Sequence, residues 1–444
     1  MDYISHKKQD IDEIKKALKI DSIDDLITDI PSEVRLKNLL NLPAAKTELE
    51  IQKFTDDLKK MNSADGYFSF LGAGIYNHFV PAVVDALANR SEFVTAYTPY
   101  QAEMSQGMLQ WIFEYQSSIA RLIGMEVVNA SLYDGASSVY EAAKLAVNYK
   151  KRSKILVSKY MHPEYLEVLK TGFQGLENIK IVLFGNIAEL QQLCDEETAC
   201  VIVSNPNFVG QIEDLQEIEN IAHSKEALFI VNVYPIALGI LQKPSEFSAD
   251  IVVAEGQSLG MPMNIGGATF GIFGVKKEFI RFMPGRIVGQ TTDKDGNIGF
   301  VLTMQAREQH IRREKALSNI CSNHAHYALR ALIYLSAIGD SGLKKIASLC
   351  MENAYYFAEK LDKLEDFTLV KKNNFFNEFV VKYNGKMDFE EFDKKLKDNG
   401  IVLGLKLEQY FPELNKHWLV CATEMTDKTE IDLIINTIQN LVKL

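Results

Sequence analysis

Residues 125 to 255 alternate short apolar runs of strand length with segments of helical periodicity. The runs are KILVS at 154–158, IKIVLF at 179–184, ACVIVSN at 199–205, ALFIVNV at 227–233 and DIVVA at 250–254. Strands joined by crossover helices pair in parallel, with right-handed connections and helices on both faces of the sheet. The alternation therefore predicts an α/β fold with a mainly parallel sheet, and it places ligand sites where the strands end.

The rest of the chain predicts two further parts around this sheet. Residues 1–60 read as short helices rich in Lys, Asp and Glu, broken at Pro31, and predict an N-terminal helical arm that packs on a neighbour. Residues 61–325 are expected to form the large α/β domain. In residues 326–444 two helical patterns precede strands and a last amphipathic helix, which predicts a smaller C-terminal α/β domain.

Composition excludes several classes of protein. The net charge of −11 argues against broad nucleic-acid binding, which needs a concentrated positive surface. No apolar run approaches the roughly 20 residues that span a bilayer, and the first ten residues are too polar for a signal peptide, so we expect no membrane partner and a cytoplasmic protein. The five cysteines form no C-x-x-C pair and no His lies at metal-ligand spacing, so neither disulfide nor metal is expected.

A glycine-rich stretch, ADIVVAEGQSLGMPMNIGG at 249–267, follows the last predicted strand. Gly256 to Gly260 matches G-x-S-x-G, so Ser258 could be the nucleophile of a serine hydrolase. The nucleophile elbow needs a helix after the serine, whereas here a proline, an asparagine and two adjacent glycines follow. A hydrolase using Ser258 remains an alternative interpretation, as does a scaffold protein without catalysis.

The order of these parts resembles the large domain of pyridoxal-phosphate (PLP) enzymes with the aspartate aminotransferase fold. In such enzymes an Asp at the end of one strand pairs with the pyridinium nitrogen, and a later Lys forms the Schiff base. Asn232 stands at the Asp position here and Ser258 at the Lys position, with no lysine between Lys243 and Lys276. Since serine cannot form an imine, we expect no covalently held cofactor on this chain.

Two other segments carry candidate binding residues. In DGASS at 134–138, Ser137 and Ser138 open a predicted helix whose N-terminus could bind a phosphate, although an N-cap alone explains the pattern equally well. With Asn232, these two serines are the weak candidates for cofactor binding. The segment 97–103 gathers hydrogen-bonding side chains in one loop. These candidates are Tyr97, Thr98, Tyr100, Gln101 and Glu103.

Five long motifs together resemble one family. They are YTPYQAEMSQG at 97–107, NASLYDGASS at 129–138, EGQSLGMPMNIGG at 255–267, MPGRIVGQT at 283–291 and REQHIRREKALSNICSN at 307–323. The chain is similar to the glycine dehydrogenase (decarboxylating) subunit 1 family, the alpha halves of split P-proteins of the glycine cleavage system. The N-terminal FLGAGIYNHFVPAVV also fits, so the resemblance covers nearly the whole chain.

The resemblance implies a fold, an activity and partners. It implies the PLP-dependent transferase fold, aspartate aminotransferase-like and of fold type I, and a subunit of an oxidoreductase that is inactive by itself. With subunit 2, in an expected α2β2 heterotetramer, the family decarboxylates glycine and passes the aminomethyl group to the lipoyl arm of H-protein. Pyridoxal phosphate is expected on subunit 2. The loop Tyr97 to Glu103 is expected to line a pocket shared by the two subunits.

Overall fold

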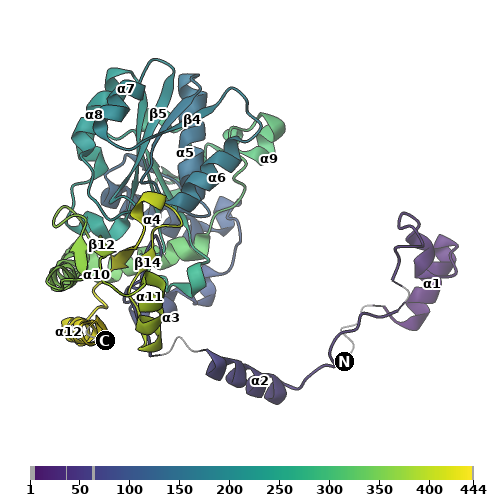
Figure 1. Ribbon diagram of the computed structural model, residues 1–444. Helices are drawn as coiled ribbons and strands as arrows, with labels where there is room; N and C mark the ends of the chain where they lie inside the picture. The colour runs from purple at the N-terminus through teal and green to yellow at the C-terminus, as the bar shows by residue number, and fades with distance from the viewer. Residues whose placement is uncertain (1–5, 37, 63–65, 443–444) are drawn as a thin grey trace. The chain divides into compact units, whose positions relative to one another are not determined.

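The structure is a computed structural model that describes residues 6–36, 38–62 and 66–442. Contacts between residues divide the chain into two compact units, Met1–Asp65 and Gly66–Leu444. Each unit is described by itself below, and both are drawn in Figure 1. Within the described ranges no helix combines the length and the apolarity that crossing a membrane requires.

In the first unit none of the described residues, 6–36 and 38–62, is buried. Helices α1 (Lys8–Leu18) and α2 (Glu48–Met61) contain no buried residue. Helix α2 begins with a capping box, in which the Thr47 hydroxyl accepts from the Glu50 amide and the Glu50 carboxylate accepts from the Thr47 amide. The large apolar side chains of α2 are exposed: Leu49, Ile51, Phe54, Leu58 and Met61. Helix α2 therefore presents apolar surface that its own unit does not cover.

The second unit is built on a seven-stranded sheet with the strand order β2-β8-β7-β6-β5-β3-β4. Strands β4, β3, β5, β6 and β7 run parallel, and β8 is antiparallel to both β7 and β2. The strands are β2 (Val127–Val128), β3 (Lys154–Ser158), β4 (Lys180–Phe184), β5 (Thr198–Asn205), β6 (Leu228–Val233), β7 (Ile251–Glu255) and β8 (Gly271–Val275). The predicted α/β fold with a mainly parallel sheet is confirmed.

Both faces of this sheet are buried, which explains why its strands are continuous apolar runs. All eight residues of β5 are buried, and successive side chains enter opposite cores: Val201 and Val203 on one face, Cys200 and Ile202 on the other. Helices on the first face are α3 (Ala82–Ala88), α4 (Gln106–Ile123), α7 (Ile187–Leu193), α8 (Leu215–Ser224) and the first half of α10 (Ala325–Asp362). Helices α5 (Gly135–Lys150) and α6 (Pro163–Phe173) cover the second face.

A smaller antiparallel sheet, in the order β11-β12-β15-β14, follows α10. It comprises β11 (Phe367–Leu369), β12 (Glu378–Tyr383), β14 (Leu405–Lys406) and β15 (His417–Cys421). The second half of α10, with α11 (Phe389–Asp398) and α12 (Lys428–Val442), packs on it around Trp418. Strand β1 (Phe68–Ser69) pairs in parallel with β13 (Ile401–Val402) in a separate two-stranded sheet, and the Cys421 amide of β15 donates to the Phe70 carbonyl at 2.9 Å, which ties the chain before α3 to the small sheet. The smaller α/β part predicted after the large sheet is thus present.

Three local predictions had different outcomes. The Asp-Gly pair at Asp295 and Gly296, flanked by strand-like residues, predicts a hairpin turn, and it joins β9 (Ile287–Thr292) to antiparallel β10 (Ile298–Thr303), so this prediction is confirmed. The two helices expected near 326–338 and 343–361 form one run, α10, with a non-helical residue at Gly339. Glu308 and Arg312 stand at i,i+4 and predict a charged helix across 307–316, but this was wrong: α9 covers only Gln309–Arg312, because Arg313 takes a φ of 53° that ends it.

Candidate functional site

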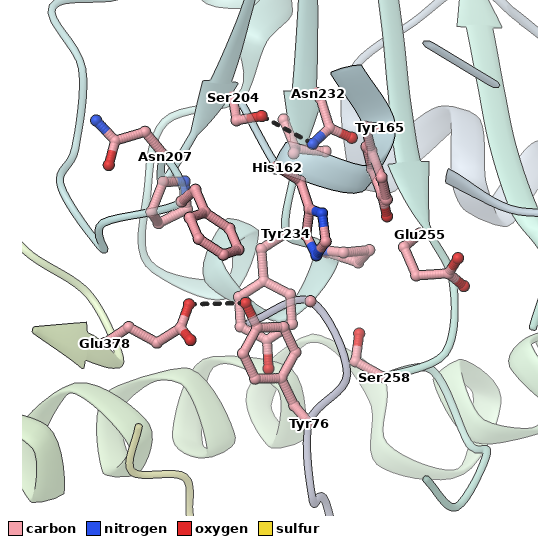
Figure 2. A pocket seen from close by; sticks show the side chains of 15 residues that line it. Tyr76, His162, Tyr165, Ser204, Asn207, Asn232, Tyr234, Glu255, Ser258 and Glu378 are labelled. Atoms are coloured by element: carbon pink, nitrogen blue, oxygen red, sulfur yellow. Dashed lines mark hydrogen bonds between the residues drawn. The ribbon is translucent and has the colours of Figure 1, made fainter. Parts of the chain in front are cut away.

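The parallel strands end at a polar cavity, as the fold class predicts. Strands β5, β6 and β7 deliver Ser204, Asn232 and Glu255 to its wall. Figure 2 shows these side chains with Tyr76 and Glu378, which come from the loop before α3 and from the small sheet. The cavity has a volume of about 60 Å³. It therefore lies where the large sheet, the small sheet and the loop before α3 meet.

Two residues that the sequence placed at the cofactor position are brought together here. The Asn232 amide nitrogen donates to the Ser204 hydroxyl at 3.0 Å, while its Oδ1 has no hydrogen-bond partner. The Ser258 side chain is only 3% exposed, and its Oγ also has no partner. Both residues line the cavity. Ser258 thus lies at the predicted lysine position but carries no amine.

The side chain of Gln257, next to Ser258, holds the backbone of Tyr76 in place beside the cavity. Its Oε1 accepts from the Tyr76 amide at 3.0 Å, and its Nε2 donates to the carbonyls of Tyr76 and Met261. Gly260 closes the turn with a φ of +89°, and a Cβ there would lie 2.8 Å from the Tyr334 Cβ. The glycine-rich stretch therefore acts as a clamp that fixes the Tyr76 backbone over the cavity.

Glu255 occupies the N-terminus of α5, the position that the sequence suggested for a phosphate. Its Oε2 accepts from the Gly135 amide at 3.0 Å and its Oε1 from the Gln257 amide at 3.0 Å. The N-cap Asp134 accepts from the Ser137 amide at 2.6 Å, and Ser138 donates its hydroxyl proton to the Asp134 carbonyl. The helix N-terminus is thus already satisfied by two carboxylates of this chain.

Glu378 supplies a second buried carboxylate, from the first residue of β12. It is 4% exposed, and it accepts from the Ala73 amide at 2.6 Å and from the Tyr76 hydroxyl at 2.8 Å. Desolvation raises the pKa of Glu378 to about 7, against a smaller opposing effect of the two hydrogen bonds. Desolvation likewise raises the pKa of Glu255 to about 7. Both carboxylates are therefore held where ionisation is unfavourable.

The remaining titratable groups do not offset this negative charge. The imidazole of His162 lies between the Ala73 carbonyl, at 2.9 Å from Nε2, and the Glu164 amide, at 3.2 Å from Nδ1. These contacts fit a neutral ring with its proton on Nε2, and burial lowers the His162 pKa. No Lys or Arg is among the described residues that line the cavity. The site is consequently rich in acceptors and acidic.

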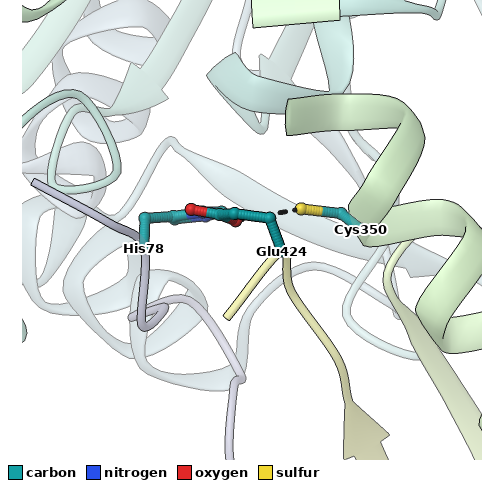
Figure 3. Close-up of side chains that lie close together, drawn as sticks. All are labelled: His78, Cys350 and Glu424. Carbon is teal, nitrogen blue, oxygen red and sulfur yellow. Dashed lines mark hydrogen bonds and ion pairs between the residues drawn. The ribbon is translucent and has the colours of Figure 1, made fainter. Parts of the chain in front are cut away.

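Next to the cavity, three potential metal ligands form a hydrogen-bonded cluster, shown in Figure 3. The Glu424 carboxylate contacts His78 Nδ1 at 2.7 Å and Cys350 Sγ at 3.4 Å, and it accepts from the Phe79 amide. His78 Nε2 contacts the hydroxyl of Tyr234, which lines the cavity. Sequence spacing did not reveal this cluster, because its members are far apart in the chain. Its contacts orient the Tyr234 hydroxyl from behind the cavity wall.

The loop of residues 97–103, which was expected to line a pocket shared by two subunits, lies outside this cavity. None of its five candidates lines the cavity. Tyr97 is 82% exposed and Tyr100 51% exposed; Gln101 and Glu103 are exposed and Thr98 is half-buried. The Tyr100 ring lies 5.8 Å from the His310 ring, and the Arg286 guanidinium lies over it at 5.7 Å. The exposed side chains of the loop 97–103 are therefore accessible to another molecule.

The hydrolase alternative finds no support in this geometry. A serine nucleophile needs a base within hydrogen-bond reach, whereas Ser258 Oγ forms no hydrogen bond with any described residue. The residues after Ser258 form turns and a 3-10 segment, Asn264–Gly266, instead of a helix that would help to bind an oxyanion. The match to G-x-S-x-G is thus a coincidence of a glycine-rich turn.

The sheet order, the antiparallel β8 and the cavity at the strand ends define the fold of PLP-dependent enzymes of fold type I. A glutamate decarboxylase from Lactobacillus brevis shares this fold with a TM-score of 0.65 at 12% identity, covering 91% of this chain and 95% of its own. A sphingosine-1-phosphate lyase from Burkholderia pseudomallei has a TM-score of 0.62 at 13% identity, covering 93% and 94%. These similarities establish the fold alone.

The chain belongs to the glycine cleavage system P-protein family, whose model matches residues 1–438. A crystal structure of glycine decarboxylase (P-protein) in inhibitor-bound form superimposes with a TM-score of 0.88 at 38% identity, over 99% of this chain and all of the other. The chain is 47% identical to "Probable glycine dehydrogenase (decarboxylating) subunit 1" of Carboxydothermus hydrogenoformans, over 99% of each. A protein of the same name from Geobacillus sp. is 47% identical, over 98% of this chain and 97% of that one.

Pyridoxal phosphate, the cofactor of this fold, does not fit the residues of this cavity. Ser258 cannot form the Schiff base, and Asn232 offers an amide where a carboxylate would hold the pyridinium proton. Glu255 already occupies the Gly135 amide, and its carboxylate would repel a phosphate. A Cβ at Gly135 would lie 2.4 Å from the Tyr165 hydroxyl, so side chains close this end of the cavity. No chemical step through the cofactor is therefore assigned to this chain.

Proposed function

We propose that this chain is the alpha subunit of a glycine decarboxylase P-protein, the subunit that lacks the Schiff-base lysine. The observation that carries the proposal is Ser258, which lines the cavity at the strand ends and carries no amine. A fold that retains the cavity but not the reactive amine suits a subunit whose partner performs the chemistry. We therefore assign pyridoxal phosphate to subunit 2, and the assembly to an α2β2 heterotetramer.

In this proposal the complex decarboxylates glycine and transfers the remaining aminomethyl group to the lipoyl arm of H-protein. The cofactor on subunit 2 supplies the electron sink for that chemistry. This chain supplies a rigid wall of the shared pocket and part of the surface that receives H-protein. Precise positioning across an interface requires that both walls are held in place before the substrate arrives.

The loop of residues 97–103 has the properties that such a wall needs. Its end is fixed by Gln106, which accepts from the Phe300 amide at 2.9 Å and donates to the Phe300 carbonyl at 2.9 Å. The side chains of Tyr97, Tyr100 and Glu103 are nevertheless exposed. A loop with a fixed backbone and exposed hydroxyl and carboxylate groups can contribute hydrogen bonds to a pocket on a second chain.

Replacing the polar groups of this loop is expected to reduce the activity of the reconstituted complex. For Tyr100→Phe and Glu103→Gln we expect kcat to fall by about tenfold or more, since each removes a hydrogen bond to a reacting group or its neighbour. Glycine- and H-protein-dependent CO₂ release by the complex measures this. Tyr67→Phe and Glu177→Gln, exposed residues outside the loop, are the matched controls. Unchanged turnover in both loop variants would exclude the loop from the pocket.

Co-expression separates this proposal from a scaffold without a catalytic partner. Purified alone, this chain is expected to show no glycine-dependent release of CO₂, whereas the chain together with subunit 2 releases it. Ser258→Ala should leave the activity of the complex within about twofold, because that hydroxyl touches no described partner and lies in the cavity of this chain only. A complex that loses its activity on Ser258→Ala would contradict the assignment of the chemistry to subunit 2.

A further inference from the structure

The cluster beside the cavity brings together three side chains that are far apart in the sequence. His78 lies in the loop before α3, Cys350 in α10 and Glu424 just after β15. One nitrogen, sulfur or oxygen atom from each lies within 4.8 Å of the other two, as Figure 3 shows. Imidazole, thiolate and carboxylate are the kinds of ligand that Zn²⁺ takes in proteins. The cluster therefore has the composition of a zinc site.

The spacing of these atoms is close to that of a tetrahedral site. Zn²⁺ binds sulfur at about 2.3 Å and oxygen or nitrogen at about 2.0–2.1 Å, which places S and O about 3.5 Å apart and N and O about 3.3 Å apart. Cys350 Sγ is 3.4 Å from Glu424 Oε2, and His78 Nδ1 is 2.7 Å from the same oxygen. Of these two distances only the second has to increase, by about 0.6 Å, for the atoms to bind one ion.

Contacts outside the cluster orient two of its members. The second oxygen of Glu424 accepts from the Phe79 amide at 2.8 Å. The second nitrogen of His78, Nε2, contacts the Tyr234 hydroxyl. With its proton on Nε2, His78 donates to that hydroxyl, and Nδ1 is then able to bind an ion. Histidines that bind metals generally donate their other ring N–H in this way, because the contact fixes the ring and its tautomer.

The backbone segments that carry the three side chains are also tied to one another. The Thr423 hydroxyl, next to Glu424, donates to the carbonyl of Asn77, next to His78, at 2.7 Å. Asn353, one turn of α10 after Cys350, donates its side-chain amide to the Thr423 carbonyl at 3.0 Å. The cluster is therefore held in place before an ion arrives, which reduces the conformational cost of binding.

Charge balance also favours a dication. The side chains of His78 and Glu424 are 1% and 8% exposed, and Cys350 is fully buried. Among the described residues the only ion pair of Glu424 is with His78, and no Lys or Arg contributes. One Zn²⁺ with one carboxylate and one thiolate has no net charge, so the filled site avoids the cost of burying a charge. The thiol proton of Cys350 leaves to water when the ion binds, because thiolate is the ligand.

We infer that His78, Cys350 and Glu424 bind one Zn²⁺ ion, which joins the loop before α3, helix α10 and the segment after β15. A water molecule fills the fourth tetrahedral position. Mg²⁺ and Ca²⁺ are poor alternatives, since they prefer oxygen ligands alone. Sequence spacing predicts no metal, because the three ligands meet only in the folded chain. This inference concerns the chain itself and does not depend on the assembly proposed above.

Zinc chloride is the probe, titrated by calorimetry into the full chain after a chelator has removed bound metal. We expect saturable binding of one ion per chain, and no competition from Mg²⁺. Co²⁺, which takes tetrahedral zinc sites, should give the charge-transfer absorption of a cobalt–thiolate bond. The midpoint of thermal unfolding should rise with the concentration of Zn²⁺, because the ion binds the folded chain.

Matched variants locate the ion. Cys350→Ala and Glu424→Gln each remove a ligand, so we expect the affinity for Zn²⁺ to fall about 100-fold or more, since loss of an outer contact alone typically costs about 10–100-fold. The controls remove a buried cysteine of β5, an exposed cysteine and a buried glutamate of α5, none of which belongs to the cluster: Cys200→Ala, Cys321→Ala and Glu141→Gln. They should bind Zn²⁺ as the wild type does. Near-ultraviolet circular dichroism checks that each variant keeps its packing.

Three results would overturn the inference. Absence of one-to-one binding would mean that the hydrogen bonds within the cluster are its only role. A cobalt–thiolate absorption that persists in Cys350→Ala, or disappears in Cys321→Ala, would place the ion on another cysteine. Equal losses in Glu424→Gln and Glu141→Gln would mean that general negative charge attracts the ion. The assay needs neither glycine nor a second protein, so its outcome is independent of the proposed function.

Discussion

Ser258→Lys is expected to leave the chain without a cofactor imine when pyridoxal phosphate is added, even though it restores the missing amine. The new side chain would sit at a position that is 3% exposed, in a cavity that has no group to hold a phosphate. The Glu255 carboxylate accepts a hydrogen bond from the Gly135 amide at the N-terminus of α5, and the Asp134 carboxylate accepts one from the Ser137 amide. The cofactor's dianion would meet carboxylates where the fold normally presents free amides.

Borohydride reduction followed by peptide mapping measures this outcome, because it distinguishes an adduct at position 258 from adducts on surface lysines. The triple variant S258K/N232D/E255A is the informative comparator, since it also frees the Gly135 amide and supplies a carboxylate for the pyridinium. An adduct that forms in the triple variant but not in Ser258→Lys would show that Glu255 and Asn232 prevent the cofactor from binding. A stoichiometric adduct in Ser258→Lys alone would show that the lysine was the only missing element.

The large sheet was predictable because its signal is local. Strands β3, β5, β6 and β7 are buried on both faces, so each is a run of apolar residues that sequence alone identifies, and the partly exposed edge strand β4 is apolar as well. Asn232 and Ser258 were assigned to one site through the resemblance to pyridoxal-phosphate enzymes, and this assignment agrees with the rule that parallel strands end at one edge of the sheet. Glu255 was within reach as well, since it is the acidic residue at the end of β7, directly before Gly256.

The rest of the site depends on long-range pairing, which the sequence does not display. Glu378 and Tyr76 are 302 residues apart, and they meet only because the loop before α3 passes between the two sheets. Glu424 and His78 are 346 residues apart, and neither stands in a recognisable motif. The helix expected across 307–316 failed for a different reason: its charge pattern is helical, but the backbone reverses at Arg313. Local periodicity predicted the sheet but could not predict these contacts.

Between pH 5 and pH 8, Glu378 is expected to lower the free energy of unfolding of the wild-type chain by about 3 kcal/mol. Glu378→Gln is expected to abolish this loss. The pKa of Glu378 is about 7 in the folded chain against 4.5 for an ordinary Glu. Between these values the unfolded chain has released its proton while the folded chain still holds it, so the free energy of unfolding falls as the pH rises. The full loss is reached above pH 7, at about 1.4 kcal/mol per unit of pKa.

Urea denaturation at several pH values, followed by tryptophan fluorescence, checks this, because Trp111 and Trp418 both lie in the unit that contains Glu378. Glutamine keeps the shape of the side chain: its Oε1 can accept from the Ala73 amide, and its Nε2 can donate to Tyr76. The variant should therefore gain stability relative to the wild type as the pH rises, with the remaining slope due to Glu255.

Glu424→Gln is the control, since His78 and the Phe79 amide lower the pKa of Glu424. That carboxylate titrates below the measured range, so its replacement should not flatten the curve. A Glu378→Gln curve parallel to the wild type would mean that Glu378 ionises in the folded chain as it does in water.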